Sequence, residues 1–192
     1  MAEPAIRHMT LAEFLRWEDG TDTRYELIGG VPTAMAPPAR AHGVMCARLA
    51  GLLDAGLRSR RPCMTQVEAG IVPAGRDDTF YVADLAVTCS PYRRGEQIAN
   101  DPILVVEILS PSTERHDRQT KVPAYREIES VNEILIVDSQ SIYAEILRRE
   151  GNRWITELVR GRDSVIGLSS VGLRIPMADL SEGLDVDSEN AA

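Results

Sequence analysis

The segment PILVVEILS, residues 102–110, constrains the fold more than any other stretch of this chain. Every residue between Pro102 and Ser110 is apolar except Glu107. An apolar run of strand length, without alternation of polar residues, is typical of a β-strand that is covered on both faces. We therefore expect a central sheet with other elements packed against both of its sides.

Helix and turn signals surround this strand on both sides in the sequence. A capping box at Thr10–Glu13 predicts a short helix over residues 11–18, and helical apolar spacing predicts a longer helix over residues 39–58. Gly29-Gly30, between two short apolar segments, predicts a β-hairpin. A third helix is expected over residues 121–129. Runs rich in β-branched and aliphatic residues predict further strands within residues 63–73, 80–88, 132–138, 141–150 and 151–160 and near residue 173.

The 192 residues are enough for one domain, and we find neither an internal repeat nor a linker. We expect an N-terminal extension over residues 1–9, a single α+β domain over residues 10–180, and an acidic, disordered tail over residues 181–192. No apolar run approaches the roughly 20 residues that span a bilayer, and the first residues lack the apolar region of a secretory signal. These features predict a cytoplasmic protein.

The charge and the cysteines narrow the class of protein. A net charge of −8 argues against a sequence-independent coat on nucleic acid, which needs a basic face. A local basic groove stays compatible with this charge, and so do simple solvated arginines, at the clusters Arg58/Arg60/Arg61, Arg93/Arg94 and Arg115/Arg118. Cys46, Cys63 and Cys89 lack metal-ligand spacing, so we expect reduced, partly buried thiols.

Two carboxylates stand alone in strands that are predicted to be buried. Glu107 is the only charge in PILVVEILS, and Asp84 is the only charge in FYVADLAVT. If these strands are neighbours, the two side chains can converge and bind a hard divalent cation, Mg²⁺ or Mn²⁺. The alternative is that each acid accepts hydrogen bonds from arginines or from backbone amides. Glu26 in YELI is a third candidate of this kind, and Glu68 in QVEAG is a weaker fourth.

Lys121 is the only lysine in a chain that contains 20 arginines. It follows Glu107 by 14 positions, on the element after that strand, so its ammonium can return to the carboxylate pair. A lysine there can orient or deprotonate a water and can neutralise charge on a phosphorane, which arginine does poorly. The single retained lysine therefore indicates either a functional position or retention by chance.

The order of these features resembles the Uma-two-type restriction endonuclease family of bacteria, a branch of the PD-(D/E)XK nuclease superfamily. The resemblance rests on RYELIGG, His42, ADLAV, the segment PILVVEILSPSTERHDRQTK and the following NEILIVD, and it covers roughly residues 9–180. It implies a restriction-endonuclease-like core, with a central mixed sheet flanked by helices, and an Mg²⁺-dependent endonuclease that hydrolyses DNA phosphodiester bonds. It also implies a homodimer, because two strands must be cut.

The resemblance assigns roles residue by residue. Asp84 and Glu107 become metal ligands, Glu26 binds through water or completes the acidic set, and Lys121 positions the attacking water. The superfamily usually places its lysine two residues after the second acid, where this chain has Leu109, and the family shares the displacement to Lys121.

The remaining residues near the motif carry less specific expectations. Because proline is tolerated only in a first helical turn, Pro123 predicts a helix that begins near Lys121 or is kinked there. His42 is interpreted as either structural or substrate-facing, and His8 and His116 as surface positions. Two other functions stay open: a catalytically inactive module that uses the cleft for binding or oligomer contacts, and a phosphoesterase acting on nucleotides.

Overall fold

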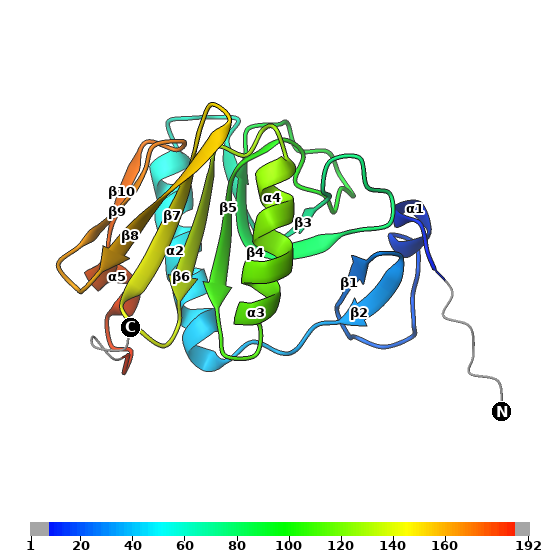
Figure 1. Ribbon diagram of the computed structural model, residues 1–192, viewed down its shortest axis with the longest axis horizontal. Helices are drawn as coiled ribbons and strands as arrows, with labels where there is room; N and C mark the ends of the chain where they lie inside the picture. Colours follow the sequence, from blue (N-terminus) through cyan, green and yellow to red (C-terminus); the bar gives the residue numbers. More distant parts are fainter. Residues whose placement is uncertain (1–7, 187–192) are drawn as a thin grey trace.

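A computed structural model describes residues 8–186, and its centre is a six-stranded mixed sheet (Figure 1). The strand order is β3-β4-β5-β6-β7-β8, and every neighbouring pair is antiparallel except β5 and β6, which are parallel. The strands are β3 (Met64–Ile71), β4 (Tyr81–Thr88), β5 (Pro102–Leu109), β6 (Glu133–Asp138), β7 (Tyr143–Glu150) and β8 (Arg153–Arg160). The predicted α+β fold with a central mixed sheet is therefore confirmed.

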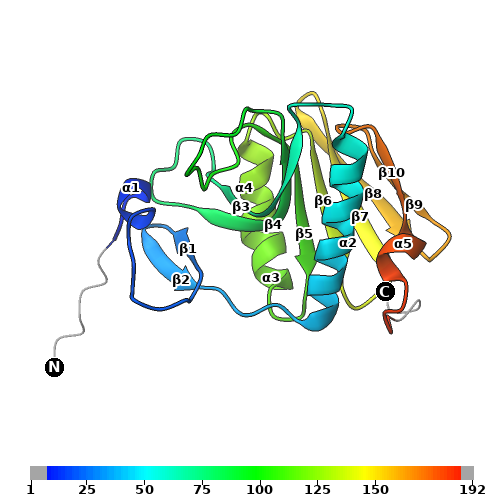
Figure 2. The same cartoon turned by 180° about the vertical axis from the view of Figure 1, so that it is seen from behind.

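One face of the sheet is covered by the long helix α2 (Arg40–Leu57), which lies in front of the strands in Figure 2. Its buried side chains Met45, Leu49, Leu53 and Leu57 recur every three or four residues, so they form a single apolar stripe. This stripe packs with side chains of β4, β5 and β6 in the largest hydrophobic cluster. The helix begins one residue after the predicted start and ends one residue before the predicted end.

The opposite face is covered by the connection between β5 and β6, seen in front of the sheet in Figure 1. This connection contains α3 (Glu114–His116), a π-helical turn η1 (Asp117–Lys121) and α4 (Val122–Glu127). Val122 and Tyr125 pack on this face in a second hydrophobic cluster with Val105 and Leu109. Because helices cover both faces of the sheet, the side chains on both sides of β5 are buried, which explains its continuous apolar sequence.

A small unit stands beside the β3 end of the sheet. It contains α1 (Leu11–Phe14) and the antiparallel hairpin of β1 (Tyr25–Ile28) and β2 (Val31–Ala34). The predicted capping box is present, but the α-helix ends at Phe14 and not near residue 18. Backbone hydrogen bonds in both directions between Leu27 and Phe80 attach the hairpin to the segment that leads into β4.

A second hairpin covers part of the α2 face near the other edge of the sheet. Its strands are β9 (Val165–Leu168) and β10 (Leu173–Pro176), and α5 (Met177–Ser181) follows them. The buried Glu133 of β6 holds the hairpin turn, because its carboxylate accepts hydrogen bonds from the backbone and hydroxyl groups of Ser169 and Ser170 and from Arg148 Nε at 2.7 Å.

The end of the folded part lies beyond the predicted start of the tail. Ser181 is buried in α5, and Leu184 and Val186 pack against the largest cluster. Apolar contacts therefore hold residues 181–186 to the domain, and the expected disorder is wrong for them. The rest of the predicted tail, residues 187–192, and most of the predicted N-terminal extension, residues 1–7, lie outside the described residues.

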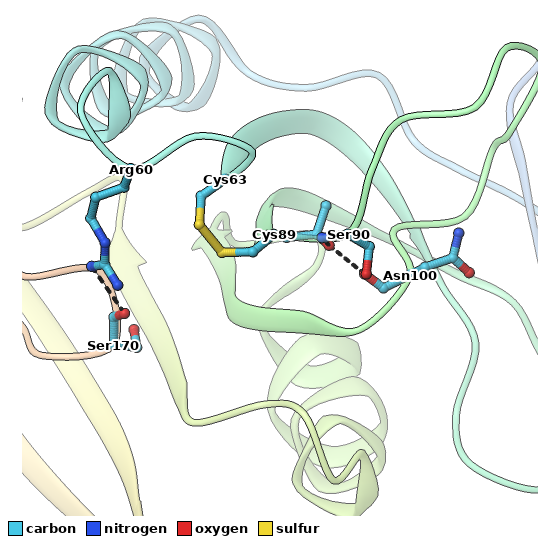
Figure 3. Close-up of a disulfide and its surroundings, with 7 residues drawn as sticks. Arg60, Cys63, Cys89, Ser90, Asn100 and Ser170 are labelled. Carbon is cyan, nitrogen blue, oxygen red and sulfur yellow. Dashed lines mark hydrogen bonds between the residues drawn. A yellow bond between two sulfur atoms is a disulfide. The ribbon is translucent and has the colours of Figure 1, made fainter.

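The cysteines differ from the expectation of three reduced thiols. Cys63, just before β3, and Cys89, just after β4, form a disulfide, and only Cys46 is free among them (Figure 3). The antiparallel pairing of β3 with β4 places Met64 opposite Thr88 and so brings the two flanking cysteines together. The two cysteines are separated by 26 positions, so the sequence alone did not indicate that they lie close together.

Candidate active site

Asp84 and Glu107 lie on neighbouring antiparallel strands, β4 and β5. Leu85 pairs with Val106, so continuing that register by one residue places Asp84 opposite Glu107. Both side chains line a cavity of about 350 Å³ between the N-terminal hairpin, the start of α2 and η1. The pairing of β4 with β5 therefore brings the side chains of Asp84 and Glu107 together.

Lys121 lies at the same cavity with its side chain almost completely buried. Its Nζ is 2.9 Å from the carbonyl oxygen of Val82, 3.2 Å from Glu26 Oε1, 3.2 Å from Asp117 Oδ1 and 3.3 Å from Glu107 Oε1. These four oxygens come from β4, β1, η1 and β5, and they surround one compact ammonium group. A planar guanidinium, which is larger and carries its donors in a fixed fork, does not match this arrangement.

The charge state of Lys121 follows from its neighbours. Burial alone lowers the pKa of Lys121, but the carboxylates of Glu107, Glu26 and Asp117 outweigh burial and raise the pKa well above its ordinary value. The side chain is therefore an ammonium at neutral pH. It can donate hydrogen bonds and neutralise negative charge, and it cannot serve as a general base.

The α-helix α4 starts at Val122, directly after Lys121, with Pro123 in its first turn, so the expected helix start close to Lys121 is present. The sequence did not predict the helical residues before it: α3 from Glu114 and the π turn η1, whose last residue is Lys121, lead into α4. Val122 N–H donates to the carbonyl of Asp117, five residues back, and Pro123 follows immediately. Because an interior proline lacks an N–H and its ring crowds the preceding turn, this wider turn is the local adjustment that accommodates it.

Glu26 contacts the Lys121 ammonium but does not itself line the cavity. Its Oε1 accepts a hydrogen bond from Val82 N at 2.9 Å and contacts Lys121, while its Oε2 lies 3.0 Å from His116 Nε2. Burial raises the pKa of Glu26, but His116 and Lys121 outweigh burial and lower it, so the carboxyl is ionised. The His116 side chain is 35% exposed, as expected of a surface position, but its ring also contacts Glu26, which the sequence did not indicate.

Glu107 is fully buried and is fixed by Tyr125. The Tyr125 hydroxyl donates to Glu107 Oε1 at 2.6 Å, and Lys121 contacts the same carboxylate. Burial raises the pKa of Glu107, and only part of this effect is offset by the ammonium of Lys121. Sequence reasoning missed Tyr125, although it follows Lys121 by four residues and thus lies on the same helix face.

His42 lies in the first turn of α2 and lines the cavity. Its Nε2 is 3.1 Å from Asp84 Oδ1, and this hydrogen bond raises the pKa of His42 against the opposing effect of burial. The other carboxylate oxygen of Asp84 accepts from Ile108 N at 2.6 Å. His42 Nδ1 is buried without a hydrogen-bond partner among residues 8–186. His42 is therefore on the cavity side of the fold.

Glu68 lines the cavity from β3, and its exposed carboxylate pairs with Arg24. Its φ is 51°, in the left-handed region that residues other than glycine seldom adopt. The register of β3 and β4 places this strained residue opposite Asp84. The weaker fourth acid of the sequence thus lies at the site as well.

The basic clusters of the sequence do not line this cavity. Arg118 pairs with Glu114 and Glu145, and Arg60 donates to the carbonyl of Ser170. Arg118 and Arg60 therefore have structural partners and do not form a basic groove at this cavity.

A hard divalent cation needs several oxygen ligands around one point. Within the described part of the chain, no group of three or more His, Cys, Asp and Glu side chains is arranged to hold a metal ion. Asp84 and Glu107 nevertheless supply two carboxylates to one cavity wall, which is the donor chemistry that Mg²⁺ and Mn²⁺ prefer. Glu26 does not fit as a direct ligand, because, unlike Asp84 and Glu107, it does not line the cavity.

The sequence profile of the Uma2 family, described as "Putative restriction endonuclease", matches residues 11–178. The chain belongs to the Uma2 family. This confirms the resemblance drawn from the motifs. Two proteins of Synechocystis, both described as uncharacterized, are similar to this Uma2 member. One is 27% identical over 183 residues, covering 90% of each chain, and the other is 25% identical over 172 residues, covering 88% of this chain and 97% of the relative.

A crystal structure from Anabaena variabilis, described as "a putative nuclease belonging to DUF820", is similar in fold to this Uma2 chain. The TM-score is 0.71, the sequence identity is 20%, and the match covers 90% of this chain and 97% of the other. No helix within residues 8–186 of the Uma2 chain is long and apolar enough to cross a membrane.

Proposed function

We propose that this protein is a metal-dependent endonuclease that hydrolyses DNA phosphodiester bonds. The observation that carries the proposal is the buried ammonium of Lys121, held at the wall of a cavity that Asp84 and Glu107 also line. Burying a charge is costly, and clusters of buried, strongly perturbed charges are frequent at functional sites. Membership of a family described as restriction endonucleases supports the same reaction.

Asp84 and Glu107 would hold the cation, Mg²⁺ or Mn²⁺. When bound, the ion would act as a Lewis acid on the scissile phosphate and lower the pKa of the attacking water. His42 orients Asp84 through Nε2, and the Tyr125 hydroxyl fixes Glu107. These contacts keep the two carboxylates in place on their strands.

Lys121 would neutralise charge on the phosphate oxygens, and it would donate a hydrogen bond to the attacking water by exchanging one of its protein oxygens for that water. Its raised pKa favours this role over proton abstraction. Glu26 and Asp117 would act as positioning residues, because each contacts the Lys121 ammonium from a different side. The assignment of Glu26 thereby shifts from the metal to the lysine.

Supercoiled plasmid incubated with Mg²⁺ or Mn²⁺ tests the proposal. The parent protein should nick the plasmid, and Lys121→Ala should not. Arg118→Ala is the matched control, since Arg118 is three residues away on the same turn and pairs with Glu114 and Glu145 outside the cavity. Equal nicking by the parent and Lys121→Ala would remove the role given to Lys121.

The inactive binding module stays the alternative, because each of the three acids already has protein partners. Calorimetric titration with Mn²⁺ separates the two. Binding by the parent that is lost in Asp84→Ala supports the nuclease, and no binding by the parent favours the module. Cytoplasmic location and a homodimer stay predictions; size-exclusion chromatography with light scattering checks the second.

A further inference from the structure

A second cavity, of about 520 Å³, adjoins the candidate active site. The two cavities share Thr23, Arg24, Glu68 and Val82 in their walls, so they adjoin each other at the hairpin and β3. The Arg24–Glu68 ion pair lies in this shared wall. A strand whose phosphate contacts the first cavity would therefore place a neighbouring nucleotide at the second.

The second cavity has aromatic walls. Both phenylalanines of the chain, Phe14 and Phe80, line it together with Trp17 and Tyr25. The phenylalanine rings are buried, whereas Trp17 and Tyr25 are half-buried and offer free ring surface. Their ring centroids are 4.9 Å apart with an interplanar angle of 76°, and the Tyr25 hydroxyl is fixed by a 2.6 Å hydrogen bond to Asp19. The two rings thus form a rigid corner.

Two free amides complete the cavity. Gln66 of β3 and Gln97 line it, and neither side chain makes a hydrogen bond within the described residues. An amide both donates and accepts, so it can pair with the polar edge of a nucleobase. The exposed guanidinium of Arg24 stands between this cavity and the candidate active site, where a phosphate linking two nucleotides would pass.

We infer that this cavity is a subsite for an unpaired nucleobase of the DNA substrate, adjacent to the scissile phosphate. Single-stranded nucleic acid is bound by a combination of aromatic stacking and backbone charge, and hydrogen bonds to base edges become accessible when the base leaves its stack. Trp17 and Tyr25 supply the stacking surface and Gln66 and Gln97 the edge contacts. The inference rests on the proposed function and deepens it: the substrate carries at least one unpaired nucleotide beside the cut.

Tryptophan fluorescence tests the subsite without any need for cleavage. The chain has two tryptophans, and Trp154 lies on β8, at the opposite edge of the sheet from β3. In a Trp154→Phe background, Trp17 is the only reporter. Titration with a thymidine oligonucleotide in EDTA should quench it, and a fully paired duplex of equal length should quench it at least tenfold more weakly. No quenching by the oligonucleotide would overturn the inference.

Variants measured by fluorescence anisotropy of labelled oligonucleotide identify the stacking contribution. Trp17→Leu should raise the Kd roughly fivefold to a hundredfold, the range expected for losing one stacked base, while Trp17→Phe should stay within about threefold of the parent. Gln97→Ala, an exposed position, should weaken binding several-fold with its fold intact. Equal Kd values for the parent, Trp17→Leu and Gln97→Ala would contradict the subsite even if one variant is less stable.

The outcomes for the subsite and for the nuclease are separable. Loss of plasmid nicking in Lys121→Ala with unchanged Trp17 quenching supports both. Quenching without any cleavage by the parent leaves the subsite and removes the nuclease. Cleavage of fully paired and gapped duplexes at equal rates, with no Trp17 quenching, leaves the nuclease and removes the subsite.

Discussion

Replacing Lys121 by methionine should destabilise the protein strongly, and more at neutral than at acid pH. Methionine keeps the length and the apolar stem of lysine but removes the ammonium. Glu26, Glu107 and Asp117 then remain buried around a neutral thioether. Three carboxylates without a cation are costly, because a buried charge that loses its partner retains the full penalty of desolvation.

The magnitude follows from the contact distances. At the 3.3 Å that separates Lys121 Nζ from Glu107 Oε1, an effective dielectric constant of about 20 gives an attraction of about 5 kcal/mol. Most of this attraction offsets the cost of burying both charges. Breaking such a pair on one side typically costs about 3–5 kcal/mol, which we expect at pH 7.

The pH dependence has a definite sign. In Lys121→Met the three carboxyls lose the cation that opposed burial, so the folded pKa of Glu26 rises, and the folded pKa values of Glu107 and Asp117, which burial already raises in the parent, rise further. A carboxyl of this kind stabilises the fold below its unfolded pKa, and this stabilisation is lost as pH rises through the folded pKa. The difference in unfolding free energy between parent and variant should therefore shrink as pH falls from 8 towards 5.

Urea denaturation at several pH values measures the effect. Arg118→Met is the control, since its partly exposed guanidinium pairs with Glu114 and Glu145 and should contribute no more than about 1 kcal/mol. The reasoning is refuted if Lys121→Met loses no more stability than Arg118→Met, or if its loss is the same at pH 5 and pH 8.

Three further predictions concern the scaffold. Glu133→Gln should cost about 2–3 kcal/mol at pH 7 in urea denaturation, because charged hydrogen bonds are lost. Burial raises the pKa of Glu133, but its hydroxyl and guanidinium donors outweigh burial and lower it. The stabilisation by Glu133 is therefore present above the unfolded pKa, and the difference in unfolding free energy between parent and variant should close as pH falls through the folded pKa. A gap that widens with acid would contradict this. Gly70→Ala should lower the melting temperature, since an added Cβ would overlap the Gln97 carbonyl oxygen and an aromatic ring, at a cost of about 1–3 kcal/mol, whereas Gly167→Ala meets nothing within 4 Å and should be neutral by comparison. A thiol assay on unfolded protein should find one reactive group, Cys46, before reduction and three after it; three before reduction would argue against the disulfide.

The sequence predicted the sheet because its strands carry strong local signals. The uninterrupted run of β5 requires cover on both faces, and α2 places its apolar stripe at helical spacing, so both were found to within a residue or two. Asp84 and Glu107 stood out for the same reason: a single charge in an apolar strand is conspicuous before any partner is known.

Other parts of the site depended on partners that are distant in the chain. His116 is 90 positions from Glu26, and Cys63 is 26 from Cys89, so only strand pairing and helix packing bring them together. Pro123 indicated the start of α4, but the helical residues from Glu114 to Lys121 were missed, because a π turn joins them to α4. Local spacing does not encode such a turn.

The central claim is that Asp84 and Glu107 form a metal site within reach of the Lys121 ammonium. A crystal structure of the protein soaked in Mn²⁺ tests it most directly, because manganese is located by its anomalous scattering. We predict an anomalous peak bound by oxygens of both Asp84 and Glu107, with Lys121 beside it and Glu26 outside the coordination sphere. No peak there, with Asp84 still paired to His42 and Glu107 to Lys121, would contradict the account.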